Sequence, residues 1–264
     1  MGAVDAWFMA GIEANPPPVE ALCQAVARYH SEDHHEQVDG WADLLQDVLV
    51  GQKDVARLLD LMVLRASWRG FTEDPALRRT LVKAAAAVLD TPSGTLFIEN
   101  AGLKSGVPLM EATRRLRVLH GLRQGAFCFD KTWGFGIVQR ADDFYQKVTI
   151  DFDRKKGHQM TYAYAGESLT LIGPDHILAR RHADPAGMTR CLKDAPGEVV
   201  YLALQSFGPL SADRLREVLT THRLLDDAQW KSFWDGARKA LKKDPRVEVP
   251  ANRNEDIRLV AGGL

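Results

Sequence analysis

Two groups of side chains in this 264-residue sequence have types and spacings suited to binding a partner. The first is Trp133-Gly134-Phe135-Gly136, in which glycines flank an aromatic residue. Glycine at such positions permits a bulge or a sharp corner at the start of a strand. The two rings therefore form either an exposed lip for a partner or a cap on the interior of a small β domain. We assign partner binding to this lip and to the turn after it, at Trp133, Phe135, Arg140, Phe144 and Tyr145.

The second group is a basic helix face near the carboxy terminus. Aromatic and aliphatic residues recur on one side of residues 228–241, which leaves basic side chains largely on the other side. These cations, with others in the segment that follows, are candidate phosphate contacts to nucleic acid: Lys231, Arg238, Lys239, Lys242, Arg253 and Arg258. Acidic residues on the same elements, such as Asp235 and Asp244, oppose a polyanion. The face is therefore suited either to duplex DNA or to a protein.

Residues that could support catalysis are not gathered in a recognisable motif. The sequence contains no phosphate-binding loop, His-Glu-x-x-His, Gly-x-Ser-x-Gly or spaced cysteine quartet. Its three cysteines are far apart, and the histidines and carboxylates of residues 30–36 lie side by side rather than at i, i+4 spacing. We therefore expect a non-enzymatic protein without a cofactor or a metal ion.

Charge and hydropathy limit the partners further. The formal net charge is −1, which argues against a general nucleic-acid coat. Residues 179–264 nevertheless hold 15 lysines and arginines against 12 acidic residues, so any nucleic-acid contact is expected there. The sequence has no apolar run long enough to cross a bilayer and no amino-terminal signal pattern. We expect a cytoplasmic protein with no membrane partner.

The aromatic-glycine segment lies within residues 121–178, the part of the chain that has β character. Residues 147–153 alternate between apolar and polar side chains, the period of a strand with one buried face. A third strand is predicted through Met160, Tyr162 and Tyr164, and a short fourth one over residues 168–172. Several short strands in so little sequence predict a small closed barrel, because closure removes exposed edges.

Helical segments lie on both sides of this β region. Apolar spacing predicts helices over residues 19–29, 38–50, 54–68, 75–89 and 108–119, which form an α-helical bundle or solenoid-like arm over residues 1–120. Residues 179–196 read as a linker. Residues 197–264 contain three predicted helices and two short strands, the order of a winged helix. The fold class expected is therefore α+β and multidomain: a mainly α-helical bundle, a small SH3/Tudor-like barrel and a carboxy-terminal winged helix.

The β region and the carboxy-terminal region together resemble a known family. The pattern Trp133-Gly-x-Gly-x-Val, the strand 147–152 and the segment 157–169 are similar to Tudor or SH3-like barrels of bacterial transcription proteins. Residues 230–250 add an aromatic helix, a Lys-Lys-Asp run and a valine-proline strand. In this order, the two modules resemble the amino-terminal extension of Gre-type transcript cleavage factors of the chlamydial and verrucomicrobial lineage.

The resemblance implies a transcription-associated interaction module that docks on RNA polymerase through the barrel. A complete Gre-type factor also needs a long antiparallel coiled coil with an acidic tip, and this sequence has no such segment. Only the extension is resembled, so we do not expect cleavage-stimulating activity. The alternative function is a winged-helix regulator that binds duplex DNA.

Overall fold

The fold is described from a computed structural model, which covers residues 2–31, 35–68, 72–250, 252 and 255–260. The chain forms two compact units. The first comprises Met1–Ala126 and Ile137–Thr170, and the second comprises Phe127–Gly136 and Leu171–Leu264. Among the described residues, no helix has both the length and the apolar character needed to cross a bilayer.

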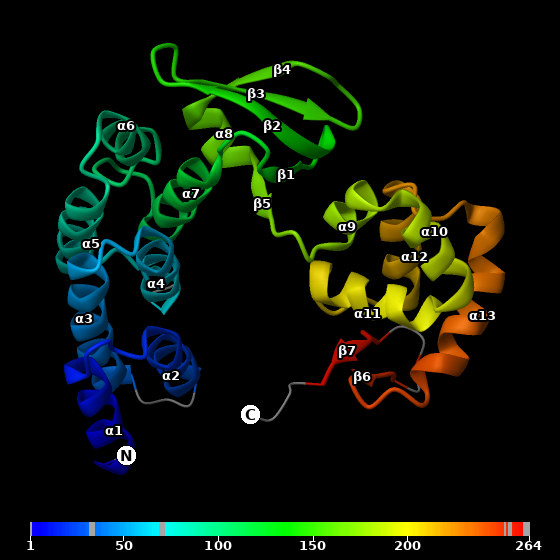
Figure 1. Cartoon of the computed structure of the whole chain (residues 1–264), viewed down its shortest axis with the longest axis horizontal. Coiled ribbons are helices and arrows are strands. Elements are labelled where there is room, and N and C mark those ends of the chain that lie inside the picture. The colour runs from blue at the N-terminus through cyan, green and yellow to red at the C-terminus, as the bar shows by residue number, and fades with distance from the viewer. Residues whose placement is uncertain (1, 32–34, 69–71, 251, 253–254, 261–264) are drawn as a thin grey trace. The chain divides into compact units, whose positions relative to one another are not determined.

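The first unit begins with a stack of helices (Figure 1). In chain order these are α1 (Gly2–Glu13), α2 (Val19–Ser31), α3 (His35–Gly51), α4 (Val55–Trp68), α5 (Pro75–Val88), α6 (Pro92–Asn100) and α7 (Leu109–Gly121). The five helices expected from apolar spacing are α2, α3, α4, α5 and α7, and all five are present. Their buried leucines and alanines form the core of this arm.

Two further helices, α1 and α6, were not expected. The α1 sequence is apolar on most sides and shows no helical period, yet it buries Phe8, whose ring stacks on Trp41 at 4.6 Å. Helix α6 has ordinary start signals, since the Thr91 side chain accepts a hydrogen bond from the Gly94 amide at 3.0 Å and Pro92 follows the cap. An N-cap and a proline can thus reveal a helix too short to display a period.

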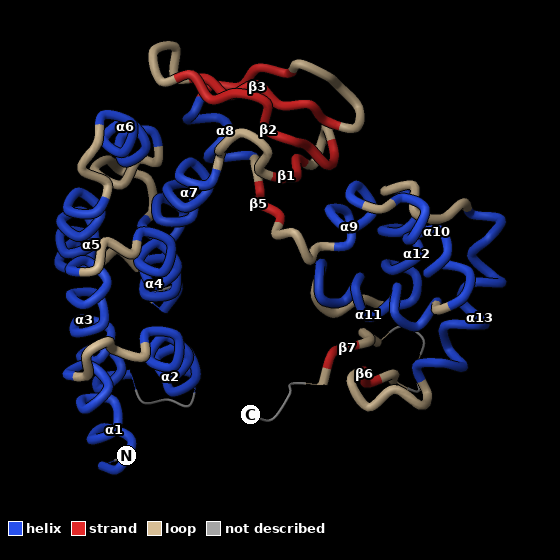
Figure 2. Tube along the Cα trace, viewed as in Figure 1, coloured by secondary structure: helices blue, strands red, loops and turns tan. Residues whose placement is uncertain are grey.

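The β region is a five-stranded sheet (Figure 2). Its strands are β1 (Phe127–Asp130), β2 (Gly134–Asp142), β3 (Lys147–Phe152), β4 (His158–Thr161) and β5 (Thr170–Ile172), in the order β4-β3-β2-β1-β5. The predicted alternation in β3 is confirmed, because Val148, Ile150 and Phe152 are all fully buried. The strand order establishes a small sheet with β4 and β5 as its outer strands and does not establish a closed barrel. The boundary between the two units passes through β2 and β5.

The prediction of a third strand running through Tyr162 and Tyr164 was wrong. The strand ends at Thr161, and helix α8 (Tyr162–Ser168) begins there. The Thr161 hydroxyl accepts a hydrogen bond from the Tyr164 amide at 3.3 Å, as an N-cap residue does. Gly166 of α8 packs on α7, because the nearest side-chain atoms of Arg115 and Leu119 lie about 3.4 Å from where its Cβ would be. The alternation of tyrosines was thus one turn of an α-helix.

The second unit contains the remaining helices of the chain and a short hairpin. Its remaining elements are α9 (Ile177–Ala183), α10 (Pro185–Asp194), α11 (Pro196–Phe207), α12 (Ala212–Thr221), the short 3-10 helix η1 (Asp227–Gln229), α13 (Trp230–Leu241), β6 (Val247–Glu248) and β7 (Arg258–Leu259). The expected three helices and two strands are present as α11, α12, α13, β6 and β7. Leu210 and Ile257 form an additional antiparallel bridge beside this hairpin.

Residues 179–196, expected to be a linker, are mostly helical. The dipeptide Asp184-Pro185 begins α10 rather than breaking the chain, because the Asp184 carboxylate accepts a hydrogen bond from the Gly187 amide at 2.7 Å. Ile177, Leu178 and Ala179 of α9 are buried. These two helices therefore belong to the folded second unit, which begins in the sequence well before residue 197.

Candidate functional site

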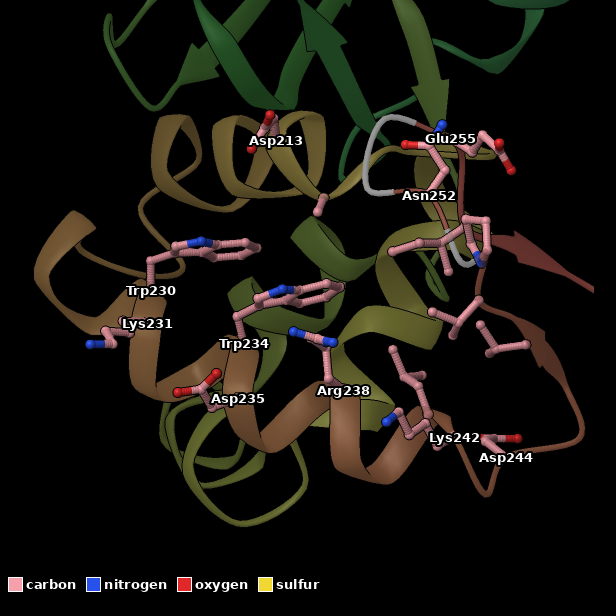
Figure 3. Close-up of a pocket in the computed structure, with 16 residues that line it drawn as sticks. Asp213, Trp230, Lys231, Trp234, Asp235, Arg238, Lys242, Asp244, Asn252 and Glu255 are labelled. Carbon is pink, nitrogen blue, oxygen red and sulfur yellow. The ribbon is translucent and has the colours of Figure 1, made fainter.

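A groove of about 680 Å³ lies along α13 in the second unit (Figure 3). We call it the α13 groove, and α12, α13 and the β6–β7 segment supply its walls. Its apolar lining is Ala212, Trp230, Trp234, Leu241, Val247, Val249, Pro250 and Ile257. Its polar lining is Asp213, Lys231, Asp235, Arg238, Lys242, Asp244, Asn252 and Glu255. The groove is thus an apolar channel with charged edges.

The helical period of α13 separates its core face from its groove face. Phe233, Ala237 and Leu241 are buried in the unit, at i, i+4 and i+8 spacing. Trp230 and Trp234 are only partly buried, and their rings stack with centroids 5.4 Å apart and planes 9° apart. Figure 3 shows both rings extending side by side into the groove. The two indoles therefore form a continuous, partly exposed aromatic wall.

The start of α13 is fixed locally. The Asp226 amide donates a hydrogen bond to the Gln229 side chain at 3.0 Å, which ties the preceding turn to η1. Asp227 also pairs with Arg216 of α12 at 2.9 Å. These contacts tie the turn that begins α13 to α12.

Arg246 holds the opposite wall in position. Its guanidinium pairs with Asp244 at 2.7 Å and with Glu198 of α11, and it lies 4.2 Å from the centre of the Tyr201 ring. The hydrogen bonds from Arg246 lower the pKa of Asp244 below its ordinary value, so this carboxylate stays charged. The valines that follow, Val247 and Val249, both line the groove.

The charged edge of the groove contains both signs. Three cations, Lys231, Arg238 and Lys242, are set against the four carboxylates of Asp213, Asp235, Asp244 and Glu255. A surface for DNA phosphates has an excess of cations, because binding comes largely from replacing counterions. Apolar walls with edges of alternating charge are instead typical of a protein-binding groove. The lining favours a protein.

The predicted nucleic-acid residues do not all reach this groove. Lys231, Arg238 and Lys242 line it, whereas Lys239 and Arg258 are exposed but lie outside its lining. Arg253 lies outside the described residues. The structure thus divides the predicted basic face into a groove edge and separate exposed cations.

The predicted aromatic lip is also divided. Phe135 is 2% exposed and its ring packs against those of Phe127 and His182, with centroids 5.5 and 5.7 Å away, so it belongs to the core and cannot form a lip. Trp133 is partly buried in a turn, where its amide donates to the Asp130 carboxylate at 2.9 Å. Trp133 lies in the turn before β2 and Phe135 lies in the core, so the two rings differ in exposure.

The remaining predicted partner residues lie at the turn between β2 and β3. Phe144 and Tyr145 are 84% and 66% exposed. Arg140 is exposed on β2 and pairs with Asp142. These three residues of the first unit occupy one hairpin.

Several functional candidates were not found from the sequence. The groove residues Asp213, Val249 and Glu255 come from separate elements that only the fold brings together. The Trp230-x-x-x-Trp234 spacing was a usable signal, since residues at i, i+4 lie on one helix face. The sequence pattern groups both tryptophan rings with the core residue Phe233, whereas the structure leaves both rings partly exposed.

Comparison with known proteins identifies one domain family and several relatives. The sequence profile of the GRAD helix-turn-helix domain matches residues 178–262. The chain is 31% identical over 164 residues to transcription elongation factor GreA of Chlamydia pneumoniae, an alignment that covers 61% of this chain and 23% of the relative. It is 27% identical over 156 residues to GreA of Chlamydia trachomatis, which covers 58% of this chain and 22% of the relative. No solved structure matches significantly.

A third relative is a Treponema pallidum protein named for GreA-associated domains, 25% identical over 122 residues, or 46% of this chain and 18% of the relative. The chain therefore spans between 18% and 23% of the length of these three curated relatives. The expected relationship to Gre-type proteins is confirmed at this level, and the matched carboxy-terminal region is of the GRAD helix-turn-helix type. Over part of its length, the chain is related to proteins named GreA.

Proposed function

We propose that this chain is a non-enzymatic interaction module of a transcription-associated protein and that it docks on RNA polymerase. The α13 groove carries this proposal, because it offers a protein partner an aromatic wall with charges of both signs at its edges. The relatives named transcription elongation factor GreA supply the transcriptional context. The SH3/Tudor-like interpretation of the sheet is part of the same proposal and rests on sequence resemblance.

The groove has the dimensions and chemistry of a site for an amphipathic helix or an extended apolar segment. Partly exposed tryptophans are frequent energetic centres of interfaces, because a large rigid ring buries much apolar area with little loss of entropy. The charges around them set orientation and discriminate between partners more than they add affinity. A segment of RNA polymerase with apolar residues between charged ones would satisfy both parts.

The test is co-elution of the full chain with core RNA polymerase of the source organism in gel filtration, followed by titration on immobilised polymerase. Trp230→Ala combined with Trp234→Ala should weaken binding by roughly 30-fold or more, as expected for loss of an interface centre of about 2 kcal/mol. Trp7→Ala is the matched control, because Trp7 is 46% exposed on α1, outside the groove.

The control should bind polymerase as the wild type does, and near-UV circular dichroism should show that each variant keeps its fold. No co-elution of the wild-type chain at low or moderate salt would refute polymerase docking. Co-elution that is unaffected by the two tryptophan substitutions would refute the role of the groove.

Duplex DNA binding is a second candidate function, favoured by four exposed cations on α13 and at its C-cap: Lys231, Arg238, Lys239 and Lys242. If these cations contact phosphates, affinity must fall steeply as salt is raised. A fluorescence-anisotropy titration with a labelled duplex at two salt concentrations measures this slope. A duplex that binds while polymerase does not would make DNA the partner of the carboxy-terminal region.

A further inference from the structure

The turn between β2 and β3 carries the two most exposed large apolar side chains of the described residues. Phe144 is 84% exposed and Tyr145 is 66% exposed, and their rings meet edge to face with centroids 4.9 Å apart and planes 89° apart. We call these two rings the β2–β3 tip. Large adjacent aromatics in water are unfavourable unless a partner covers them.

The backbone that carries the tip is fixed to two helices through Asp143. One carboxylate oxygen accepts a hydrogen bond from the Tyr162 hydroxyl of α8 at 2.6 Å, and the other accepts one from the Ser93 hydroxyl of α6. Tyr162 is only 1% exposed, and its ring packs edge-on against Phe97 of α6. The turn is thus held by a buried side chain as well as by its own strands.

Neighbouring residues add three more constraints. The side-chain amide of Asn100 in α6 donates a hydrogen bond to the side-chain oxygen of Gln146 at 2.9 Å. The backbone amide of Tyr162 donates one to the backbone carbonyl of Gln146 at 2.8 Å. The Asp142 carboxylate accepts a hydrogen bond from the Tyr145 amide at 3.1 Å. A turn held in this way loses little freedom when a partner binds, so less of the contact energy is spent on ordering.

A depression of about 480 Å³ lies beside the Tyr145 ring. It is lined by Arg140, Asp142, Tyr145, Lys147, Thr149 and Gln159. Asp142 is the one carboxylate in this lining, and it already accepts hydrogen bonds from Arg140 and the Tyr145 amide, which lower its pKa. The Lys147 ammonium, the Thr149 hydroxyl and the Gln159 amide supply donors around it. The depression is therefore suited to a carboxylate.

We infer that the β2–β3 tip is a preorganised anchor that inserts into an apolar pocket of a folded protein, with an aspartate or glutamate of that protein seated in the depression. The inference rests on the proposed function, and RNA polymerase is the partner to which it commits. The basic and donor-rich lining complements an acidic pocket edge. Single-stranded nucleic acid is disfavoured, because the perpendicular rings do not form a stacking platform for successive bases.

The test measures binding of full-length variants to immobilised core RNA polymerase. Phe144→Ser combined with Tyr145→Ser should weaken binding at least 30-fold, and Lys147→Glu should weaken it about 10-fold, with a larger effect at low salt. Tyr164→Ser is the matched control, because Tyr164 is 52% exposed on α8 and is not in the depression lining. This control should bind within about 2-fold of the wild type.

Tyr162→Phe tests the rigidity of the tip separately, because it removes only the hydroxyl that donates to Asp143. Binding should weaken about 3- to 10-fold while both tip rings remain. Wild-type binding with an unaffected tip double variant would overturn the anchor and leave the proposed function standing. No wild-type binding would overturn both. Loss of single-stranded oligonucleotide binding in the tip variant, with polymerase binding unchanged, would also overturn the anchor.

Discussion

Among the arginines of α7, Arg114 should be the one whose replacement most destabilises the contact between α7 and α8. The Arg114 guanidinium donates hydrogen bonds to the carbonyls of Gly166, Glu167 and Leu169 at 2.9, 2.8 and 3.1 Å. These carbonyls lie at the carboxy-terminal end of α8, where they have no partner within the helix. The same Arg114 guanidinium also donates hydrogen bonds to both carboxylate oxygens of Glu111, each at 2.8 Å.

The magnitude follows from these contacts. A hydrogen bond contributes about 0.5 to 1.5 kcal/mol net, and one from a charged donor contributes more. Because the Arg114 side chain is 35% exposed, water can replace part of the lost bonding, and Arg114→Met should cost about 2 to 3 kcal/mol. The pKa of Glu111 is lowered, mainly by the hydrogen bond from Arg114. This pair's contribution is therefore present above the ordinary glutamate pKa and is lost as pH falls through the lowered value.

Hydrogen exchange followed by mass spectrometry measures this effect locally, in peptides that cover residues 162–172. Arg114→Met should speed exchange there and leave peptides of α13 unchanged. Arg117→Met is the control on the same helix, because Arg117 is 54% exposed and pairs with the exposed Asp60, a contact of at most about 1 kcal/mol. Equal exchange in the two variants would refute the reasoning that Arg114 caps α8.

Three further predictions concern other parts of the chain. Burial lowers the pKa of His176 to about 4, and its ring nitrogen accepts a hydrogen bond from the Leu178 amide at 3.2 Å, so the neutral ring is the stabilising form. Stability should be full above the unfolded pKa of about 6.5 and should fall by up to about 3 kcal/mol as pH drops toward 4, a slope that His176→Gln should remove in denaturant titrations at several pH values. Gly94→Ala should lower the thermal midpoint clearly, because a Cβ would lie 2.2 Å from the Leu89 carbonyl oxygen; a midpoint equal to that of the wild type would show that α6 can shift. Replacing Arg238, Lys239 and Lys242 with glutamine should reduce any duplex binding seen at low salt and flatten its salt dependence. An unchanged anisotropy titration would make these cations a solvated surface only.

Local signals in the sequence determined most of the secondary structure. Helices α2, α3, α4, α5 and α7, and the order of three helices and a hairpin at the carboxy terminus, were predicted because apolar spacing and caps act within a few residues. The Ser211 cap is one case, since its hydroxyl accepts a hydrogen bond from the Arg214 amide at 3.3 Å. The alternation in β3 is another, because one buried face imposes a period of two.

Tertiary structure decided which of the candidate residues can meet a partner. Trp133 and Phe135 form one aromatic pair in the sequence, and Phe144 and Tyr145 form another. The structure nevertheless buries Phe135 and exposes Phe144. Burial depends on which elements pack over a strand, and that information is not contained in the residues of the strand itself. The Tyr162 alternation failed for a similar reason, because two-residue and helical periods cannot be distinguished over three residues.

The α13 groove shows the same division between sequence and structure. The sequence alone determined that α13 has an aromatic side and a basic side, because both follow from the helical period. The groove itself joins residues of α12, α13 and the β6–β7 segment that are up to 45 positions apart, from Ala212 to Ile257, and their meeting depends on long-range packing. Asp235 and Asp244 are already near these cations in the sequence, whereas only the fold could bring Asp213 of α12 to the same groove.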